Sequence, residues 1–223
     1  MRNIIGGVFL SLDGVMQGPG GPTEDVTGGF DEGGWVFKIW DDAVGDAIGR
    51  LFAGEYDLLL GRRTYDIFAA YWPYVEGEGA AMGEAFTHVN KYVLTRGDQP
   101  LEWANSHRLT CIDDVAALKQ DDGPDLIIQG SSTLYPALLA AGLIDRLMLM
   151  TFPVTLRKGK RLFGDGTPTL MLKMVDHKVT AKGTVIATYE PVGALPPFPP
   201  FGPQPSTSSR EAERQRRMAE GSW

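Results

Sequence analysis

The sequence has one cysteine, Cys111, in 223 residues, so no disulfide can form within the chain. This scarcity favours a reducing compartment, and we expect a cytoplasmic protein. Leu109 and Ile112 flank the thiol. The sequence therefore predicts that Cys111 is a small buried residue rather than a nucleophile.

Long apolar runs are missing too. No segment approaches the ~20 apolar residues that a membrane span needs, and the stretch after Met1 is too short for a signal peptide. Acidic residues outnumber lysine and arginine by 28 to 21, for a net charge of −7. This excess argues against nucleic acid or an anionic membrane as a partner. The three histidines have no ligand spacing between them, so we expect no metal site.

What is present is an ordinary globular composition, 43% hydrophobic and 22% charged, in a chain long enough for one α/β domain. Patterns typical of strands cover residues 3–11, 57–60, 91–95, 108–112, 126–129, 145–152, 170–180 and 183–190. Helical patterns cover 41–53, a segment from 62, a segment from 113 or 114 to 119, and a segment from 134 to Gly142. Helices alternate with strands only up to Gly142. The order therefore predicts a mixed, mostly parallel central sheet with helices on both faces and an antiparallel C-terminal part.

Two segments fall outside this pattern. The loop over residues 13–34 is rich in glycine, and a loop this long in a compact domain is usually functional or disordered. Residues 191–223 begin with seven of the chain's 15 prolines and end in a polar stretch able to form a transient helix. We therefore expect a domain over 1–190 and a disordered or arm-like tail over 191–223.

Three predicted strands end in turns suited to an anion. The turns are Gly61-Arg62-Arg63-Thr64, Thr95-Arg96 and Gly130-Ser131-Ser132-Thr133. If the strands are parallel, all three turns lie at one edge of the sheet, where open α/β sheets bind ligands. Glycine lets a phosphate approach the backbone, and two of the turns open helices whose first N–H groups are unpaired.

Each turn alone has a simpler explanation, because Gly-Ser-Ser-Thr is a common helix cap and Arg62-Arg63 a common solvated pair. Their coincidence in an acidic protein predicts an anion with several phosphates. Three arginines exceed the need of a pyrophosphate, which favours a 2′-phosphate and hence NADPH over NADH. No G-x-G-x-x-G follows the first strand, so an ordinary Rossmann site is not indicated.

Several motifs carry a family resemblance over residues 2–190. They are Ser11-Leu12-Asp13-Gly14, Gly33-Gly34-Trp35, Leu59-Leu60-Gly61-Arg62-Arg63-Thr64-Tyr65, Gln129-Gly130-Ser131, Leu143-Ile144-Asp145, Pro153-Val154 and Gly159-Lys160-Arg161-Leu162-Phe163. The chain resembles the dihydrofolate-reductase-like proteins related to the reductase domain of bacterial riboflavin biosynthesis.

That resemblance implies a cofactor arrangement. The turns 61–64 and 130–133 would bracket the pyrophosphate of NADPH. Thr95 and Arg96, with Arg62 or Arg63, would hold its 2′-phosphate. The loop 13–34 would be a mobile active-site loop that closes over the nicotinamide and excludes water.

The resemblance also implies a substrate site. Asp13 would lie beside the substrate as the catalytic carboxylate, although Asp-Gly is also a common turn pair. Gly14, Trp35 and Phe37 would line the substrate pocket, and the two aromatic residues fit a hydrophobic core equally well. No acid falls at the place where dihydrofolate reductase holds folate, so folate is not expected. Arg157 stands where relatives often have glycine, which leaves a substrate-phosphate role for that turn open.

The sequence thus predicts an NADPH-dependent reductase that passes hydride to a small heterocyclic, pterin- or pyrimidine-like, or carbonyl substrate. Two alternatives remain: a non-catalytic nucleotide-sensing module of the same fold, and a reductase that uses a reduced deazaflavin. We also expect a homodimer, which the resemblance implies and which the antiparallel edge after residue 143 could form by pairing or packing with its copy. Two alternatives stay open for the tail: it packs across the partner, anchored by Phe198 and Phe201, or it is flexible.

Overall fold

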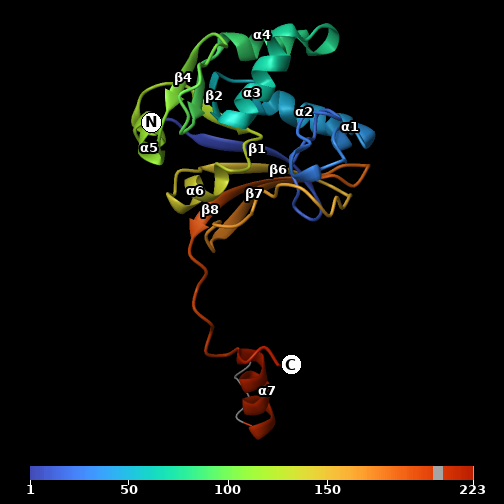
Figure 1. Ribbon diagram of the computed structural model, residues 1–223, viewed down its shortest axis with the longest axis vertical. Coiled ribbons are helices and arrows are strands. Elements are labelled where there is room, and N and C mark those ends of the chain that lie inside the picture. The colour runs from blue at the N-terminus through green and yellow to red at the C-terminus, as the bar shows by residue number, and fades with distance from the viewer. Residues whose placement is uncertain (203–207, 223) are drawn as a thin grey trace.

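The computed structural model describes residues 1–202 and 208–222 and is built on one eight-stranded sheet (Figure 1). The strands are β1 (Ile4–Ser11), β2 (Tyr56–Gly61), β3 (Lys91–Leu94), β4 (Ser106–Leu109), β5 (Asp125–Gln129), β6 (Arg146–Phe152), β7 (Met171–Val179) and β8 (Val185–Gly193). The helices are α1 (Trp35–Lys38), α2 (Asp42–Leu51), α3 (Arg62–Tyr71), α4 (Ala80–His88), α5 (Ile112–Gln120), α6 (Tyr135–Ala140) and α7 (Ser209–Ala219), with short 3-10 turns η1 (Thr27–Gly29), η2 (Trp72–Tyr74) and η3 (Gly77–Gly79).

The strand order is β4-β3-β2-β5-β1-β6-β8-β7. The first six strands in this order run parallel, whereas β8 is antiparallel to both β6 and β7. This confirms the predicted mixed sheet with its antiparallel C-terminal part. Every residue of β2 is buried, as expected for a central parallel strand covered on both faces.

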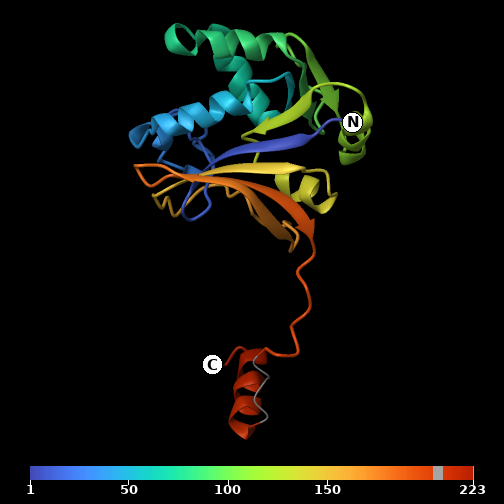
Figure 2. The same cartoon turned by 180° about the vertical axis from the view of Figure 1, so that it is seen from behind.

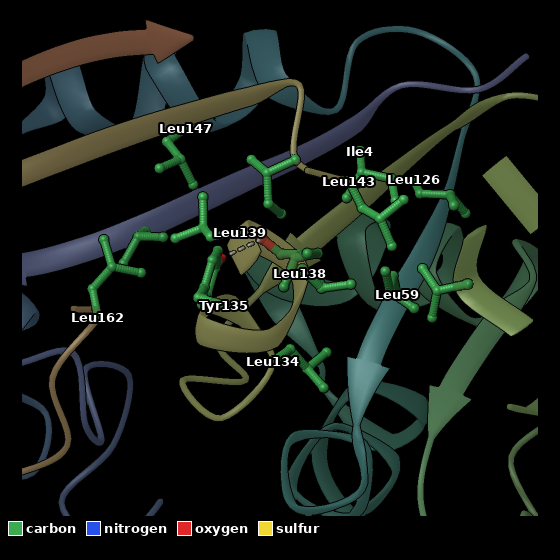
Figure 3. Close-up of a cluster of buried hydrophobic side chains, with 14 of the residues drawn as sticks. Ile4, Leu59, Leu126, Leu134, Tyr135, Leu138, Leu139, Leu143, Leu147 and Leu162 are labelled. Atoms are coloured by element: carbon green, nitrogen blue, oxygen red, sulfur yellow. Dashed lines mark hydrogen bonds between the residues drawn. The ribbon is translucent and has the colours of Figure 1, made fainter. Parts of the chain in front are cut away.

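Helices cover both faces of the sheet, as Figures 1 and 2 show from opposite sides. On one face, Tyr135 and Leu138 of α6 pack against Ile4 and Leu126 in a single core cluster (Figure 3). Gly6 of β1 makes room for this helix, because a Cβ there would lie 2.7 Å from the Tyr135 ring. On the other face, two further clusters pack the sheet against α2, α3 and α4.

The start of α5 differs from its prediction. The helix begins at Ile112 with Cys111 as its N-cap, not with Asp113 or Asp114, and Cys111 is exposed. The prediction of a buried thiol is therefore wrong. Apolar neighbours do not bury a residue at a strand-to-helix turn on the surface, and there the Asp114 carboxylate accepts the N–H of both Thr110 and Cys111.

The C-terminal end combines strand, extended chain and helix. Strand β8 runs to Gly193, three residues past the predicted domain boundary, and residues 194–202 have no regular structure. The helix expected in the polar end is α7, which buries no residue. Residues 203–207 and 223, which the predicted tail also contains, lie outside the described residues. In the part of the chain that is described, no helix has the length and apolar character needed to cross a bilayer.

Candidate functional site

The carboxyl ends of the six parallel strands meet at one edge of the sheet, and β5 stops there before its neighbours do. Its last pairs are Gly7 with Gln129 and Leu58 with Ile127. Strand β1 continues along β6 to Ser11, and β2 continues along β3 to Gly61. The turn after β5 thus enters between two longer strands, which is the position where open α/β sheets hold their ligands.

The two glycine-containing turns at this edge are hydrogen bonded to each other. The Gly61 N–H donates to Ser131 Oγ at 2.8 Å, and the Ser131 N–H donates to Thr64 Oγ1 at 2.9 Å. Gly130 and Ser131 both have positive φ, 76° and 58°. A Cβ at Gly130 would lie 3.0 Å from Thr64 Cγ2, so only glycine fits without displacing Thr64. The sequence placed these turns at one edge, and the structure joins them directly.

Of the two glycine-containing turns, only the turn after β2 leads directly into a helix. Helix α3 starts at Arg62, directly after its N-cap Gly61, with no side-chain cap and no acidic residue in its first turn. Its first N–H groups therefore carry partial positive charge with no internal partner. Residues 131–134 instead form a turn closed by the Leu134 N–H on the Ser131 carbonyl, and α6 begins only at Tyr135. The expectation that both turns begin helices is corrected in this respect.

The three arginines share the edge but not the same environment. Gly61 pairs with Leu94, which places Arg62 beside the turn after β3. The Arg62 guanidinium is engaged: its Nε lies 2.8 Å from an Asp66 carboxylate oxygen and its Nη1 donates to the Gln99 carbonyl at 2.9 Å. Arg63 and Arg96 are exposed, and within the described residues neither side chain makes an ion pair or hydrogen bond. Two free guanidinium groups thus remain for an anion.

A fourth arginine, which the sequence analysis missed, shapes the turn after β3. Arg108 of β4 donates to the Gly97 carbonyl through Nη1 and to the Gln99 carbonyl through Nη2 at 2.6 Å. The buried Thr95 accepts the Gly97 N–H at 3.1 Å, which closes the same turn. The signal that points to Arg108 is a basic residue inside a strand, next to a turn that leaves carbonyl groups unpaired.

Asp13 lies at the far end of the edge and binds backbone rather than open solvent. One carboxylate oxygen accepts from Ser11 Oγ at 2.7 Å and from the Leu156 N–H at 3.0 Å; the other accepts from the Arg157 N–H at 2.9 Å. Partial burial raises the pKa of Asp13, but these hydrogen bonds outweigh burial and hold the pKa below its ordinary value of 3.8. Its carboxylate fixes the turn in which Arg157 has a φ of 62°.

The long loop 13–34 is also anchored to the segment after β6. Gln17 is buried, its Nε2 donates to the carbonyls of Asp25 and Thr27, and its Oε1 accepts the Lys160 N–H at 2.9 Å. The Lys160 ammonium forms an ion pair with Asp25. Lys160 belongs to one of the family motifs, but no motif contains Gln17, and the contact between the two joins residues 143 positions apart in sequence.

The three residues predicted for the substrate pocket differ in exposure and in contacts. Gly14 has a φ of 82° and its carbonyl accepts the Leu162 N–H. Trp35 is only 2% exposed, packs edge-to-face on Phe152 and donates its indole N–H to the Gln17 carbonyl. It is a core residue and offers no face to a ligand. Phe37, in contrast, is exposed.

No group of three or more histidine, cysteine, aspartate or glutamate side chains suited to a metal ion occurs within residues 1–202 and 208–222. The polar groups that gather at the edge are backbone N–H, hydroxyl and guanidinium groups. These donors suit phosphate oxygens.

Comparison with known proteins shows the family of the chain. Residues 2–186 match the family described as the RibD C-terminal domain. The chain is 27% identical over 195 residues to the uncharacterized protein YyaP of Bacillus subtilis (strain 168), covering 84% of this chain and 94% of YyaP.

Three solved structures share the fold. A protein assigned to riboflavin biosynthesis from Shewanella sp. PV-4 is 20% identical, with a TM-score of 0.61, covering 86% of this chain and 99% of that one. A pyrimidine reductase-like protein from Corynebacterium diphtheriae is 14% identical, with a TM-score of 0.56 and coverages of 86% and 92%. Dihydrofolate reductase from Enterococcus faecalis, complexed with NADP(H) and RAB-propyl, is 16% identical, with a TM-score of 0.52 and coverages of 85% and 96%.

Proposed function

This chain belongs to the RibD C-terminal domain family, and from that premise we propose that it is an NADPH-dependent oxidoreductase acting on a small heterocyclic or carbonyl substrate. One observation carries the proposal: two turns hydrogen bonded through Ser131 and Thr64 stand beside an uncapped helix start and two unpaired arginines. A binding site for several phosphate groups needs this combination of donors.

The residues present fit the cofactor. The first N–H groups of α3 and the hydroxyl groups of Ser132 and Thr133 would hold the pyrophosphate between the two turns. Gly130 would let it approach the backbone, since no Cβ fits at that position. Arg63 and Arg96 would pair with the 2′-phosphate, while Arg62 and Thr95 shape the turns around it.

NADPH, when bound, supplies the hydride. The chain would orient the cofactor along the edge and exclude water with the loop 13–34, which the structure anchors through Gln17 and Lys160. Asp13 enters the proposal as a positioning residue. A carboxylate with a lowered pKa and both oxygens engaged is a poor proton donor, and it holds the backbone of Leu156 and Arg157 in place.

Cofactor binding is tested by thermal unfolding with increasing NADPH. A ligand at 100 times its Kd stabilises the folded state by about 2.7 kcal/mol, which gives a clear rise in Tm. We expect this rise with NADPH and a much smaller one with NADH. No rise at millimolar NADPH would refute the assignment. Binding without oxidation across pterins, pyrimidines and carbonyl compounds would instead support a nucleotide-sensing module.

Assembly and location are part of the same proposal. Strand β7 is the last strand of the sheet, and it exposes Met174 and Val179 next to its unpaired backbone edge. Such an edge pairs readily with another strand. We therefore propose that the protein forms a homodimer through this edge. We also propose that it works in the cytoplasm. Light scattering at the 24.3 kDa monomer mass would exclude the dimer.

A further inference from the structure

Phe37, which is exposed, and Trp40, which is partly buried, form an aromatic pair that the proposed cofactor site does not use. Their ring centroids are 5.3 Å apart and their planes differ by 11°, so the rings are stacked. Phe37 is 62% exposed. One of its faces lies against Trp40, which leaves the opposite face for another planar group.

The pair lines a cavity of about 520 Å³ that is open to solvent on one side. The cavity is lined by Phe37, Lys38, Ile39, Trp40, Pro153 and Lys182. Pro153 directly follows the end of β6, so the cavity opens at the same edge of the sheet as the turns after β2 and β5. In the strand order, β6 lies two positions from β5, or about 10 Å.

The tight turn between β7 and β8 contributes Lys182 to the same cavity and holds its backbone in place. The Thr180 N–H donates to the Thr184 carbonyl at 2.9 Å, and the Thr184 N–H donates to Thr180 Oγ1 at 3.0 Å. Gly183, with a φ of 85°, packs against Pro153. A turn closed in this way fixes the origin of the Lys182 side chain relative to the aromatic pair.

The Lys182 ammonium is only partly used within the protein. It donates to the Trp40 carbonyl at 2.7 Å. An ammonium group has three donors, so two remain. Lys38 forms an ion pair with Glu32. Hydrogen bonds from Thr180 and Ala43, together with the nearby charge of Lys182, hold the pKa of the buried Asp41 below its ordinary value. Within the described residues Lys182 forms no ion pair, so it is the lysine at the cavity that keeps more of its charge for a ligand.

We propose that this cavity binds an aromatic anion, with its ring stacked on the outer face of Phe37 and its acid group at Lys182. The inference rests on the proposed function to the extent that Phe37 belongs to the proposed substrate pocket. It adds the chemical class of the ligand and a residue, Lys182, that selects it. A neutral ring would gain the stacking contact but not the charged hydrogen bond.

The test uses a matched pair of fluorescent probes, anionic 1-anilinonaphthalene-8-sulfonate and neutral N-phenyl-1-naphthylamine, with the full chain. We expect Phe37→Ala to weaken both probes about fivefold through lost stacking. We expect Lys182→Ala to weaken only the anionic probe, by about fivefold, and Lys182→Arg to retain its affinity. Tyr74→Ala and Lys173→Ala, which remove an exposed aromatic residue and an exposed cation elsewhere, are the matched controls.

Competition then identifies the acid group. Displacement of the anionic probe by 2-naphthoate or by 2-naphthyl phosphate supports the proposal and tells a carboxylate from a phosphate ligand. Equal displacement by neutral 2-naphthol would overturn it. So would equal effects of Phe37→Ala and Tyr74→Ala, or an unchanged probe ratio in Lys182→Ala.

A separate titration of the unmodified chain with NADPH keeps the two proposals apart. If NADPH fails to bind but the probes respond as expected, the cofactor proposal is refuted and the proposal of an aromatic-anion site is supported. If NADPH binds but the probes do not discriminate, the cavity assignment falls alone.

Discussion

The two halves of the strand-end edge differ in what their polar groups do. In the arginine half, formed by residues 61–64, 95–99 and 130–133, the turns are hydrogen bonded to one another, yet Arg63, Arg96 and the start of α3 stay unpaired. In the loop half, formed by residues 13–34 and 152–161, Gln17 binds backbone groups, and Asp13 binds two backbone N–H groups, the Ser11 hydroxyl and Arg161. The unpaired donors of the arginine half are available to a ligand, whereas the paired side chains of the loop half hold the backbone in place.

The largest expected effect tests whether the arginine half binds the nucleotide. In the double variant Arg63→Ala/Arg96→Ala, NADPH affinity should fall about 100-fold, or ~2.7 kcal/mol, because two charge-assisted hydrogen bonds to the 2′-phosphate are lost. NADH affinity should not change. Calorimetric titration measures both. The control Arg146→Ala/Arg210→Ala removes the same charge elsewhere, and an equal loss there would show that only net charge matters.

Next in size is the close approach at Gly130. In Gly130→Ala, the new methyl group meets Thr64 at a backbone conformation that costs an L-residue about 1–2 kcal/mol, so NADPH affinity should fall about tenfold. Gly142→Ala is the matched control, since Gly142 also has positive φ, 64°, but open space around it. It should lower the free energy of unfolding and leave NADPH affinity intact. Equal losses of affinity would mean that backbone strain, not the approach to Thr64, limits binding.

The role of Asp13 in the loop half can be tested through the pH dependence of the free energy of unfolding. Its lowered pKa stabilises the folded state above pH 3.8, and this contribution disappears as the pH falls through the folded-state pKa. Asp13→Asn should therefore cost about 1 kcal/mol of unfolding free energy at pH 7, and this cost should shrink as the pH falls below 3.8 toward the folded-state pKa. Urea unfolding across this range measures the difference. Asp31→Asn, at an exposed aspartate of the same loop, should show no such pH dependence; a parallel profile for both variants would contradict the scaffold role.

The smallest expected effect concerns the anchoring of the loop. Lys160→Ala removes the ion pair with Asp25 and should change the free energy of unfolding by less than about 1 kcal/mol. Hydrogen exchange around Asp25 and Thr27 should nevertheless rise, since the Lys160 ammonium contacts both residues and its loss favours local opening there. Lys158→Ala, at an exposed neighbouring lysine, provides the comparison. Unchanged exchange in Lys160→Ala would show that Gln17 alone holds the loop.

The comparison also shows what the sequence makes predictable. The turns 61–64 and 130–133 follow short buried strands, so local pattern placed them at one edge before any contact was known. The contact between Gln17 and Lys160 joins chain segments far apart in sequence, and no local pattern reveals it. Exposure was also hard to predict. Apolar neighbours suggested a buried Cys111, which is exposed, and the sequence left a pocket wall and a core position equally open for Trp35, which is buried.

The early end of β5 also bears on how the sheet moves. Seven residue pairs join β1 to β6, but only four join β1 to β5 and three join β2 to β5. Strand β5 thus lies between the strands that carry the arginine turns, β2 and β3, and those beside the anchored loop, β1 and β6. A ligand that contacts both sides would hold these two parts of the sheet together across β5, so its binding should slow amide exchange in β5 more than in β6.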